Sequence, residues 1–405
     1  MALMESLREL YRIGYGPSSS HTMGPRSATE RFIERHPEGE SYLAELYGSL
    51  AATGKGHLTD KAIREVCEKH GKKIDLRWYP DIFKSFHPNA LTIKALSKDG
   101  SVLYEKTYYS VGGGKIVTEN QNDLTPVDIY PKEHFGSMGK LLNYCSEEGL
   151  QLWEAVLEVE GNEILDYIKK VWDVMKESIL RGLENEGVLP GGLKLQRKAS
   201  QIFAKSQEFK GPFGETKLPV AYALAVSEEN AGGGKIVTAP TCGSCGVLPA
   251  VLYSLQQQEK LSDLRIYRAL LTAGIVGNIV KENGSISGAE VGCQGEVGVA
   301  CAMAGAAATQ LMGGSIYQIE YAAEMGLEHH LGLTCDPMRG LVQIPCIERN
   351  AMASMRALDH SLFALFSDGR HKVSFDAAIE VMMETGQALP SLYRETSMGG
   401  LALLK

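Results

Sequence analysis

The feature that most constrains the fold is a change of hydrophobic period between residues 118 and 140. Before it, alternating segments at 91–96, 102–109 and 115–118 are separated by Lys-Asp-Gly and Gly-Gly-Gly, which predicts short strands. Helices are expected at 2–13 and 24–36. This part is therefore predicted to be an α+β domain, residues 1–130.

After the change, longer segments with a helical period dominate. We expect a mainly α-helical domain at 140–405, with the boundary in the polar, proline-containing segment 118–134. The Ala-rich run 297–312 is too short to span a membrane and is predicted to be a buried helix, although pairing of two chains in a homodimer through it stays open. The helices are expected at 149–158, 162–184, 220–228, 266–281, 316–328 and 351–365.

Composition excludes several classes of protein. The net charge is −8 and no basic run offsets it, so no nucleic-acid partner is expected. Eight cysteines in 405 residues is too few for a disulfide scaffold. The first residues carry charges and no long apolar segment, which argues against a signal peptide or a membrane location. A reducing cytoplasm is the expected location.

Three cysteines stand in unusual surroundings: Cys293 in EVGCQGEVG, Cys335 in GLTCDPMRG and Cys346 in QIPCIERN. Each adjoins a turn-forming residue or a carboxylate, where ligands from distant segments can converge. Thiolates favour iron-sulfur clusters, zinc or copper(I), and the spacings of 42 and 11 residues match no zinc finger. Buried cysteine is also an ordinary core residue, so packing and metal binding both stay open here.

A run of hydroxyls at residues 16–22, Gly-Pro-Ser-Ser-Ser-His-Thr, leads directly into a predicted helix. Backbone N–H groups and hydroxyls at a helix start suit a carboxylate ligand. One such residue would be explained by helix capping, but this run exceeds what capping needs. The candidate binding residues are Ser18, Ser19, Ser20, His21 and Thr22.

Two histidines lie in turn-like contexts, His57 in TGKGH and His87 in FHPN. Both are candidates for proton transfer near neutral pH, with plain solvent exposure as the alternative. A second Gly-rich turn, TAPTCGSCG at 238–246, holds Cys242 and Cys245 in a C-x-x-C. Because no βαβ pattern surrounds it, a thioredoxin-like role is not favoured, and the hydroxyls there again suit a carboxylate.

Ten blocks occur in order along almost the whole chain and resemble those of the iron-sulfur-dependent L-serine dehydratases. The resemblance is to the single-chain form in which the β and α domains are fused and no ACT domain is present. The blocks are GPSSSHTMGP, YGSLAATGKGH, FHPNALTIKA, KTYYSVGGGKIV, EGVLPGGL, EENAGGGKIVTAPT, SISGAEVGCQGEVGVACAMA, LEHHLGLTCDP, VQIPCIERNA and YRETSMGGLAL.

The resemblance implies conversion of L-serine to pyruvate and ammonia without pyridoxal phosphate. It implies a [4Fe-4S] cluster held by Cys293, Cys335 and Cys346, with one iron lacking a protein ligand and free for substrate. His57 is the expected base for the α-proton, and His87 would support it or orient substrate. The residues implied in binding the substrate carboxylate are Ser18, Ser19, Ser20, His21, Thr22, Thr241 and Gly243.

Two departures from the family pattern matter. Many relatives have Asn where this chain has Cys242, which makes that thiol a candidate extra ligand, and the chain ends in LALLK without the penultimate cysteine of some relatives. Threonine dehydration and cysteine desulfuration stay open on the same scaffold, because a methyl group or a sulfur changes only pocket contacts. A non-catalytic cluster sensor and a structural zinc site are the alternatives of another class.

Overall fold

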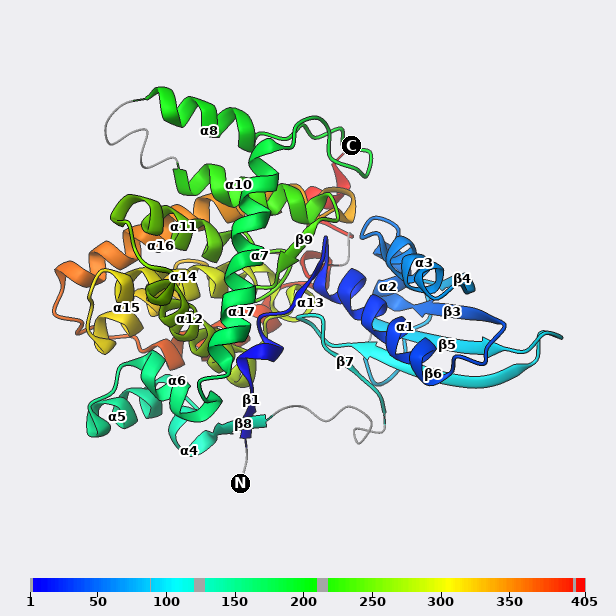
Figure 1. Cartoon of the computed structure of the whole chain (residues 1–405), viewed down its shortest axis with the longest axis horizontal. Helices are drawn as coiled ribbons and strands as arrows, with labels where there is room; N and C mark the ends of the chain where they lie inside the picture. The colour runs from blue at the N-terminus through cyan, green and yellow to red at the C-terminus, as the bar shows by residue number, and fades with distance from the viewer. Residues whose placement is uncertain (1–2, 88, 120–127, 210–217, 396–397, 405) are drawn as a thin grey trace.

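The computed structural model describes residues 3–87, 89–119, 128–209, 218–395 and 398–404. Figure 1 shows a smaller lobe built on a sheet beside a larger lobe built of helices. The predicted fold class, an α+β N-terminal domain followed by a mainly α-helical C-terminal domain, is confirmed. Part of the predicted boundary segment, residues 120–127, lies outside the described residues, so the exact domain limits stay a prediction.

The small lobe is a five-stranded sheet in the order β4-β3-β5-β6-β7. The strands are β3 (Ser41–Tyr47), β4 (Lys73–Tyr79), β5 (Asn89–Leu96), β6 (Val102–Ser110) and β7 (Ile116–Val117). β3 and β4 run parallel because α2 (Gly48–Thr53) and α3 (Thr59–Lys69) make the crossover between them, and the other pairs are antiparallel. α1 (Gly24–Arg35) and α3 bury Phe32 and Ile63 against Ile93 of the sheet. The strands predicted at 91–96 and 102–109 and the helix predicted at 24–36 are confirmed.

The helix predicted at 2–13 was wrong. The described residues form β1 (Leu3–Glu5), a 3-10 turn η1 (Leu7–Glu9) and β2 (Ile13–Tyr15). β1 pairs with β8 (Asp128–Pro131) and β2 with β9 (Lys235–Val237). Leu7, Leu10 and Tyr11 are buried in the core of the helical lobe, where the Tyr11 hydroxyl donates to the Leu270 carbonyl at 2.8 Å. Distant packing and strand pairing outweigh a weak local helix preference here.

The helical lobe begins with four shorter segments and α7, which runs along its front in Figure 1. These are α4 (Lys132–Phe135), α5 (Met138–Glu148), α6 (Leu152–Glu160), α7 (Ile164–Glu184) and α8 (Ala199–Glu208). The remaining helices are α10 (Leu218–Ala231), α11 (Val247–Glu259), α12 (Asp263–Asn283), α13 (Gly288–Val291), α14 (Val297–Leu311), α15 (Ile316–Glu328), α16 (Cys346–Phe366) and α17 (Phe375–Ala388). Each predicted helix of this part is present.

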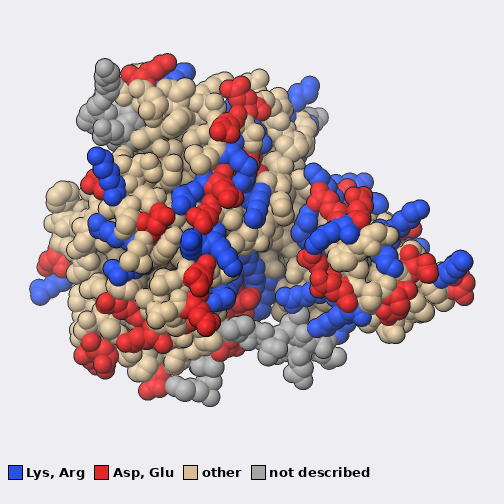
Figure 2. All heavy atoms as spheres, in the orientation of Figure 1, with Lys and Arg blue, Asp and Glu red and all other residues tan. Residues whose placement is uncertain are grey.

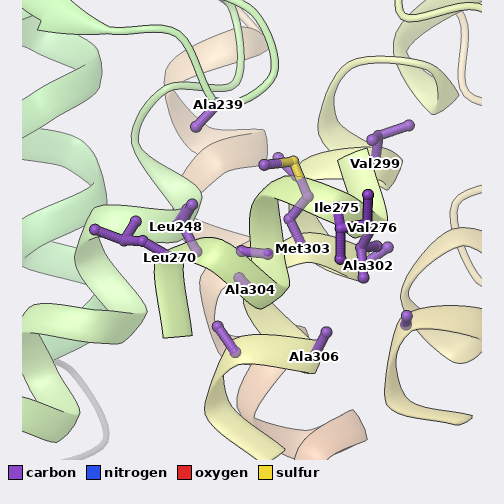
Figure 3. Close-up of a cluster of buried hydrophobic side chains, with 14 of the residues drawn as sticks. Ala239, Leu248, Leu270, Ile275, Val276, Val299, Ala302, Met303, Ala304 and Ala306 are labelled. Atoms are coloured by element: carbon purple, nitrogen blue, oxygen red, sulfur yellow. The ribbon is translucent and has the colours of Figure 1, made fainter. Parts of the chain in front are cut away.

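α14 lies at the centre of the helical lobe. Its small side chains allow the neighbouring helices to approach closely, and Figure 3 shows Ala302 and Ala304 among Leu248 of α11 and Val276 of α12. A Cβ added at Gly326 of α15 would lie 2.7 Å from the α14 backbone, so that contact needs glycine. The predicted burial of the Ala-rich run is confirmed. Among the described residues no single helix is long and apolar enough to cross a membrane, although 288–294 and 297–311 together, bent by 51°, pass on length and composition.

Glu5 joins the two lobes. Its carboxylate pairs with Lys115 of the small lobe and, at 2.5 Å, with Lys281 of α12, while Asn278 donates to the Glu5 carbonyl at 2.6 Å. Burial raises the pKa of Glu5, but Lys281 and Lys115 outweigh that effect and hold it at about 2. On the face in Figure 2, cations and anions alternate along the helical lobe, and neither sign forms an unbroken patch.

Candidate active site

The three predicted metal cysteines come together from three separate segments. Cys293 lies in the 3-10 turn η4 (Gly292–Gln294), Cys335 in the loop after α15, and Cys346 is the first residue of α16. All three are buried, with exposed fractions of 2, 4 and 7%. Cys335 and Cys346 line one cavity at the junction of the lobes, and Cys293 lies close enough to both to alter their pKa values.

A carboxyl stands among these thiols. Glu296 Oε2 lies 3.9 Å from the Cys293 sulfur and 3.9 Å from the Cys335 sulfur. The ligand atoms of these three residues lie within 4.8 Å of one another, a spacing at which they could share one metal ion. A Cβ at Gly288 would lie 3.0 Å from the Cys335 sulfur and 2.8 Å from Glu296, so a glycine is needed there to leave room for the group.

The surroundings of Cys335 and Cys346 favour the protonated thiol. Burial raises the pKa of Cys346, and the hydrogen bond with Cys293 raises that of Cys335. A bound metal would have to displace those protons, which couples its affinity to pH. Arg349, one turn into α16, donates to the Thr334 carbonyl at 2.6 Å and interacts with Cys293, so a half-buried cation faces the thiols.

The hydroxyl-rich run forms the opposite wall. Ser18 precedes the π-helical turn η2 (Ser19–Met23), and its Oγ accepts from the His21 backbone N–H at 3.1 Å. Ser18, Ser19 and Ser20 line the cavity. His21 lies behind them, with Nδ1 3.4 Å from Ser18 Oγ and Nε2 3.0 Å from Ser49 Oγ. Burial lowers the pKa of His21, so its ring is neutral at pH 7.

His57 also lines the cavity. Its exposed fraction is 1%, and neither ring nitrogen has a hydrogen-bond partner among the described residues. Burial lowers the pKa of His57 to about 4, which leaves the imidazole neutral and able to accept a proton at pH 7. The Thr22 hydroxyl donates to the His57 carbonyl at 2.6 Å, and the rings of His21 and His57 lie 4.6 Å apart. Orphaned buried nitrogens of this kind indicate a ligand or a catalytic role.

The second Gly-rich turn contributes Thr241 and Gly243 to the same cavity. The Thr241 hydroxyl donates to Glu296 Oε1 at 2.8 Å, and Asn350 Nδ2 donates to the Gly243 carbonyl at 2.7 Å. Cys242 is not among the described residues that line the cavity, and its sulfur lies 3.3 Å from the sulfur of Met23 in a buried cluster. Its role as an extra ligand stays a prediction.

His87 is not among the described residues that line the cavity. Its Nδ1 accepts from the Asn89 backbone N–H at 3.1 Å. Burial lowers the pKa of His87, and the nearby Glu290 opposes that shift. The predicted supporting role of His87 therefore stays a prediction.

Sequence reasoning missed Glu395. Its backbone N–H donates to the Cys335 carbonyl at 2.7 Å, and the Cys335 N–H donates to Tyr393 at 2.8 Å, so a short parallel bridge carries Glu395 into the cavity. Burial, Glu296 and Cys293 together raise the pKa of Glu395 to about 8. Glu296 and Arg349 were also missed. All three lie in the blocks that carry the family resemblance, and a search for charged residues within those blocks would have found them.

Two family models match the chain. The model described as "Serine dehydratase alpha chain" matches residues 102–402, and the model described as "Serine dehydratase beta chain" matches 6–70 and 67–121. The chain belongs to the serine dehydratase family. The predicted family membership, in the form that fuses both chains, is confirmed.

Members of this family from several bacteria are similar over their whole length. An L-serine dehydratase of Streptomyces coelicolor is 41% identical over 447 positions, covering 98% of both chains. L-serine dehydratase 1 of Escherichia coli is 41% identical over 453 positions, covering 99% of both, and the Haemophilus influenzae L-serine dehydratase is 40% identical with the same coverage.

Proposed function

We propose that this protein is an L-serine ammonia-lyase that converts L-serine to pyruvate and ammonia. The observation that carries the proposal is the meeting, at one cavity between the lobes, of two buried thiols with a third beside them, a hydroxyl-rich turn and a histidine without hydrogen-bond partners among the described residues. The names of the full-length relatives support L-serine as the substrate.

The donor set fits an iron-sulfur cluster. Cys293, Cys335 and Cys346 are free, buried and drawn from three segments, and thiolates are the ligands such clusters take. A [4Fe-4S] cluster held by these three would supply a Lewis acid at an iron without a protein ligand, which suits the departure of a hydroxide. Arg349 would offset part of the negative charge of the thiolates.

We assign removal of the α-proton to His57. Its place in the cavity wall and its two ring nitrogens, which lack hydrogen-bond partners among the described residues, favour this role. Loss of the α-proton and the β-hydroxyl gives aminoacrylate, whose imine tautomer hydrolyses to pyruvate and ammonia. Thr22 holds the His57 backbone through its hydrogen bond to the carbonyl. His87 is kept as a supporting group that acts from outside the cavity.

We propose that the substrate carboxylate is bound by Ser18, Ser19 and Ser20. His21 would orient the first of these hydroxyls from behind. Thr241 and Gly243 would complete the pocket from the helical lobe. No Lys or Arg is found among the described residues that line the cavity, so hydroxyls and N–H groups would carry this recognition.

A zinc site is the second candidate, favoured by the 3.9 Å approach of Glu296 to two thiols. Anaerobic reconstitution followed by iron, sulfide and zinc assays separates the two. Acid-labile sulfide together with pyruvate formation from L-serine is expected. Stoichiometric zinc without sulfide would sink the cluster proposal.

An iron without a protein ligand would be easily lost on oxidation, so we propose an oxygen-sensitive enzyme of a reducing compartment, the cytoplasm. L-threonine and L-cysteine should be tested beside L-serine, because discrimination among these three substrates depends only on contacts within the pocket. We propose no nucleic-acid or membrane partner. A homodimer remains an untested arrangement, which the mass of the protein in solution would decide.

A further inference from the structure

The described residues that line the cavity offer acidic side chains, and no lysine or arginine, to an entering ligand. The carboxyls among them are those of Glu296 and Glu395. The imidazole of His57 is neutral at pH 7. An amino acid entering the cavity brings an ammonium group, and a buried cation of that kind needs an acceptor of opposite charge.

Glu296 is already engaged. Its Oε1 accepts from the Thr241 hydroxyl at 2.8 Å, and its Oε2 faces the sulfurs of Cys293 and Cys335. The Glu296 carboxyl group is therefore positioned by Thr241 and the two thiols. Glu395 differs, because its carboxyl group faces the neutral ring of His21, whose Nδ1 lies 4.0 Å away. That distance exceeds a hydrogen bond, and the same nitrogen faces Ser18 Oγ at 3.4 Å.

The backbone of Glu395 is held in an unusual conformation. Its φ is 55°, in the left-handed region that residues other than glycine seldom adopt. The bridge with Cys335 keeps it there, and the side chain retains an exposed fraction of 18%. Strained backbone at a cavity wall is a feature of sites that position a side chain for function.

From this geometry we propose that Glu395 binds the α-ammonium group of the substrate. The role rests on the proposed function and deepens it, because it fixes the third polar substituent of the amino acid. In this arrangement the hydroxyl-rich turn would take the carboxylate and the thiol wall would face the β-hydroxyl, while Glu395 lies beside Cys335 and near His21. Glu395 would thus select amino acids over hydroxy acids.

The test uses two unreactive ligands that differ in the group at the α-carbon, L-alanine with an ammonium and L-lactate with a hydroxyl. Calorimetric dissociation constants are measured anaerobically on the reconstituted protein and on Glu395→Gln. The wild type should bind L-alanine more tightly, and the substitution should weaken that binding about 50-fold, as expected for one partner of a buried charge pair. Binding of L-lactate should change by less than about threefold. Glu38→Gln, an exposed carboxyl of the small lobe, is the matched control and should change neither.

Kinetics with L-serine give a second readout. Glu395→Gln should raise KM about 50-fold while kcat falls by less than about tenfold, and iron content should stay unchanged. Equal weakening of both unreactive ligands, or a loss of kcat at constant KM, would overturn the ammonium role. If the wild type forms no pyruvate, the proposed function fails, but the two unreactive ligands still decide the role of Glu395.

Discussion

The two walls of the cavity differ in charge and in what they can hold. The helical lobe provides two thiols and two carboxyls, with Cys293 and Arg349 beside them. The small lobe provides hydroxyls and imidazoles that burial keeps neutral. A charged wall suits a metal centre, and a neutral wall suits proton transfer and hydrogen bonding. The proposed metal ligands lie in one lobe and the proposed proton-transfer group in the other. Substitutions in the two walls should therefore change metal content and turnover separately.

The largest effect is expected from the thiol wall. Cys335→Ala removes one proposed cluster ligand, so the iron and sulfide contents should fall together with activity. We expect pyruvate formation to drop about 10,000-fold or more, since the departing hydroxide loses its Lewis acid. Cys67→Ala, a buried thiol of the small lobe, is the control and should keep both. Full activity with an unchanged iron content in Cys335→Ala would break the distinction between the walls.

A substitution in the neutral wall should lower turnover and leave the metal content unchanged. His57→Ala is expected to lower kcat about 100- to 1,000-fold, the range for a lost general base. Its iron, sulfide and visible spectrum should match the wild type. His70→Ala, whose ring bonds the Val66 carbonyl far from the cavity, serves as control. Near-normal turnover in the His57 variant would remove this residue from the mechanism.

The ion pairs of Glu5 that connect the two lobes can be tested through the free energy of unfolding. Glu5→Gln leaves Lys115 and Lys281 without their shared anion and should lower the free energy of unfolding at pH 7 by about 3 kcal/mol. Because the pKa of Glu5 lies near 2 when folded, its contribution is complete above about pH 4.5, the ordinary value, and is lost as the pH falls toward 2.

Urea unfolding at pH 7 and at pH 3 measures this difference, with the exposed Glu147→Gln as control. The gap between wild type and Glu5→Gln should shrink at the lower pH. A gap that widens on acidification would contradict the sign of the shift.

The smallest effect is expected at the hydrogen bond that links the second Gly-rich turn to the thiol group. Thr241→Val removes the donor to Glu296 and should weaken iron retention about tenfold in a chelator competition. Thr29→Val, whose hydroxyl bonds a carbonyl within α1, should leave iron retention unchanged. An unaltered iron affinity in Thr241→Val would show that Glu296 holds its place without this contact.

Much of the fold could be predicted because local pattern and packing agree. The Ala-rich run became α14 at the core, and the alternating segments became β5 and β6. The first residues could not be predicted, because Leu7 and Tyr11 are fixed by a core formed from helices far along the chain. Local propensity carries no information about such contacts.

The candidate site divides in the same way. The sequence predicted Cys293, Cys335 and Cys346 as candidate ligands from their turn-forming neighbours. It predicted residues 18–22 as a binding segment from their run of hydroxyls. The placement of Glu395 was not, since a backbone bridge to Cys335 carries it into the cavity from sixty residues away. The contact of Cys242 with Met23 was equally hidden, because the two residues are far apart in the sequence.

The central claim is that this cavity dehydrates L-serine on a cluster held by three cysteines. Its most direct measurement is the iron, sulfide and zinc content of the anaerobically reconstituted protein, followed on the same sample by pyruvate release from L-serine. The account predicts about four iron and about four sulfide per chain, with pyruvate formed at a rate that rises with iron content. Zinc without sulfide, or a full cluster that forms no pyruvate, would contradict it.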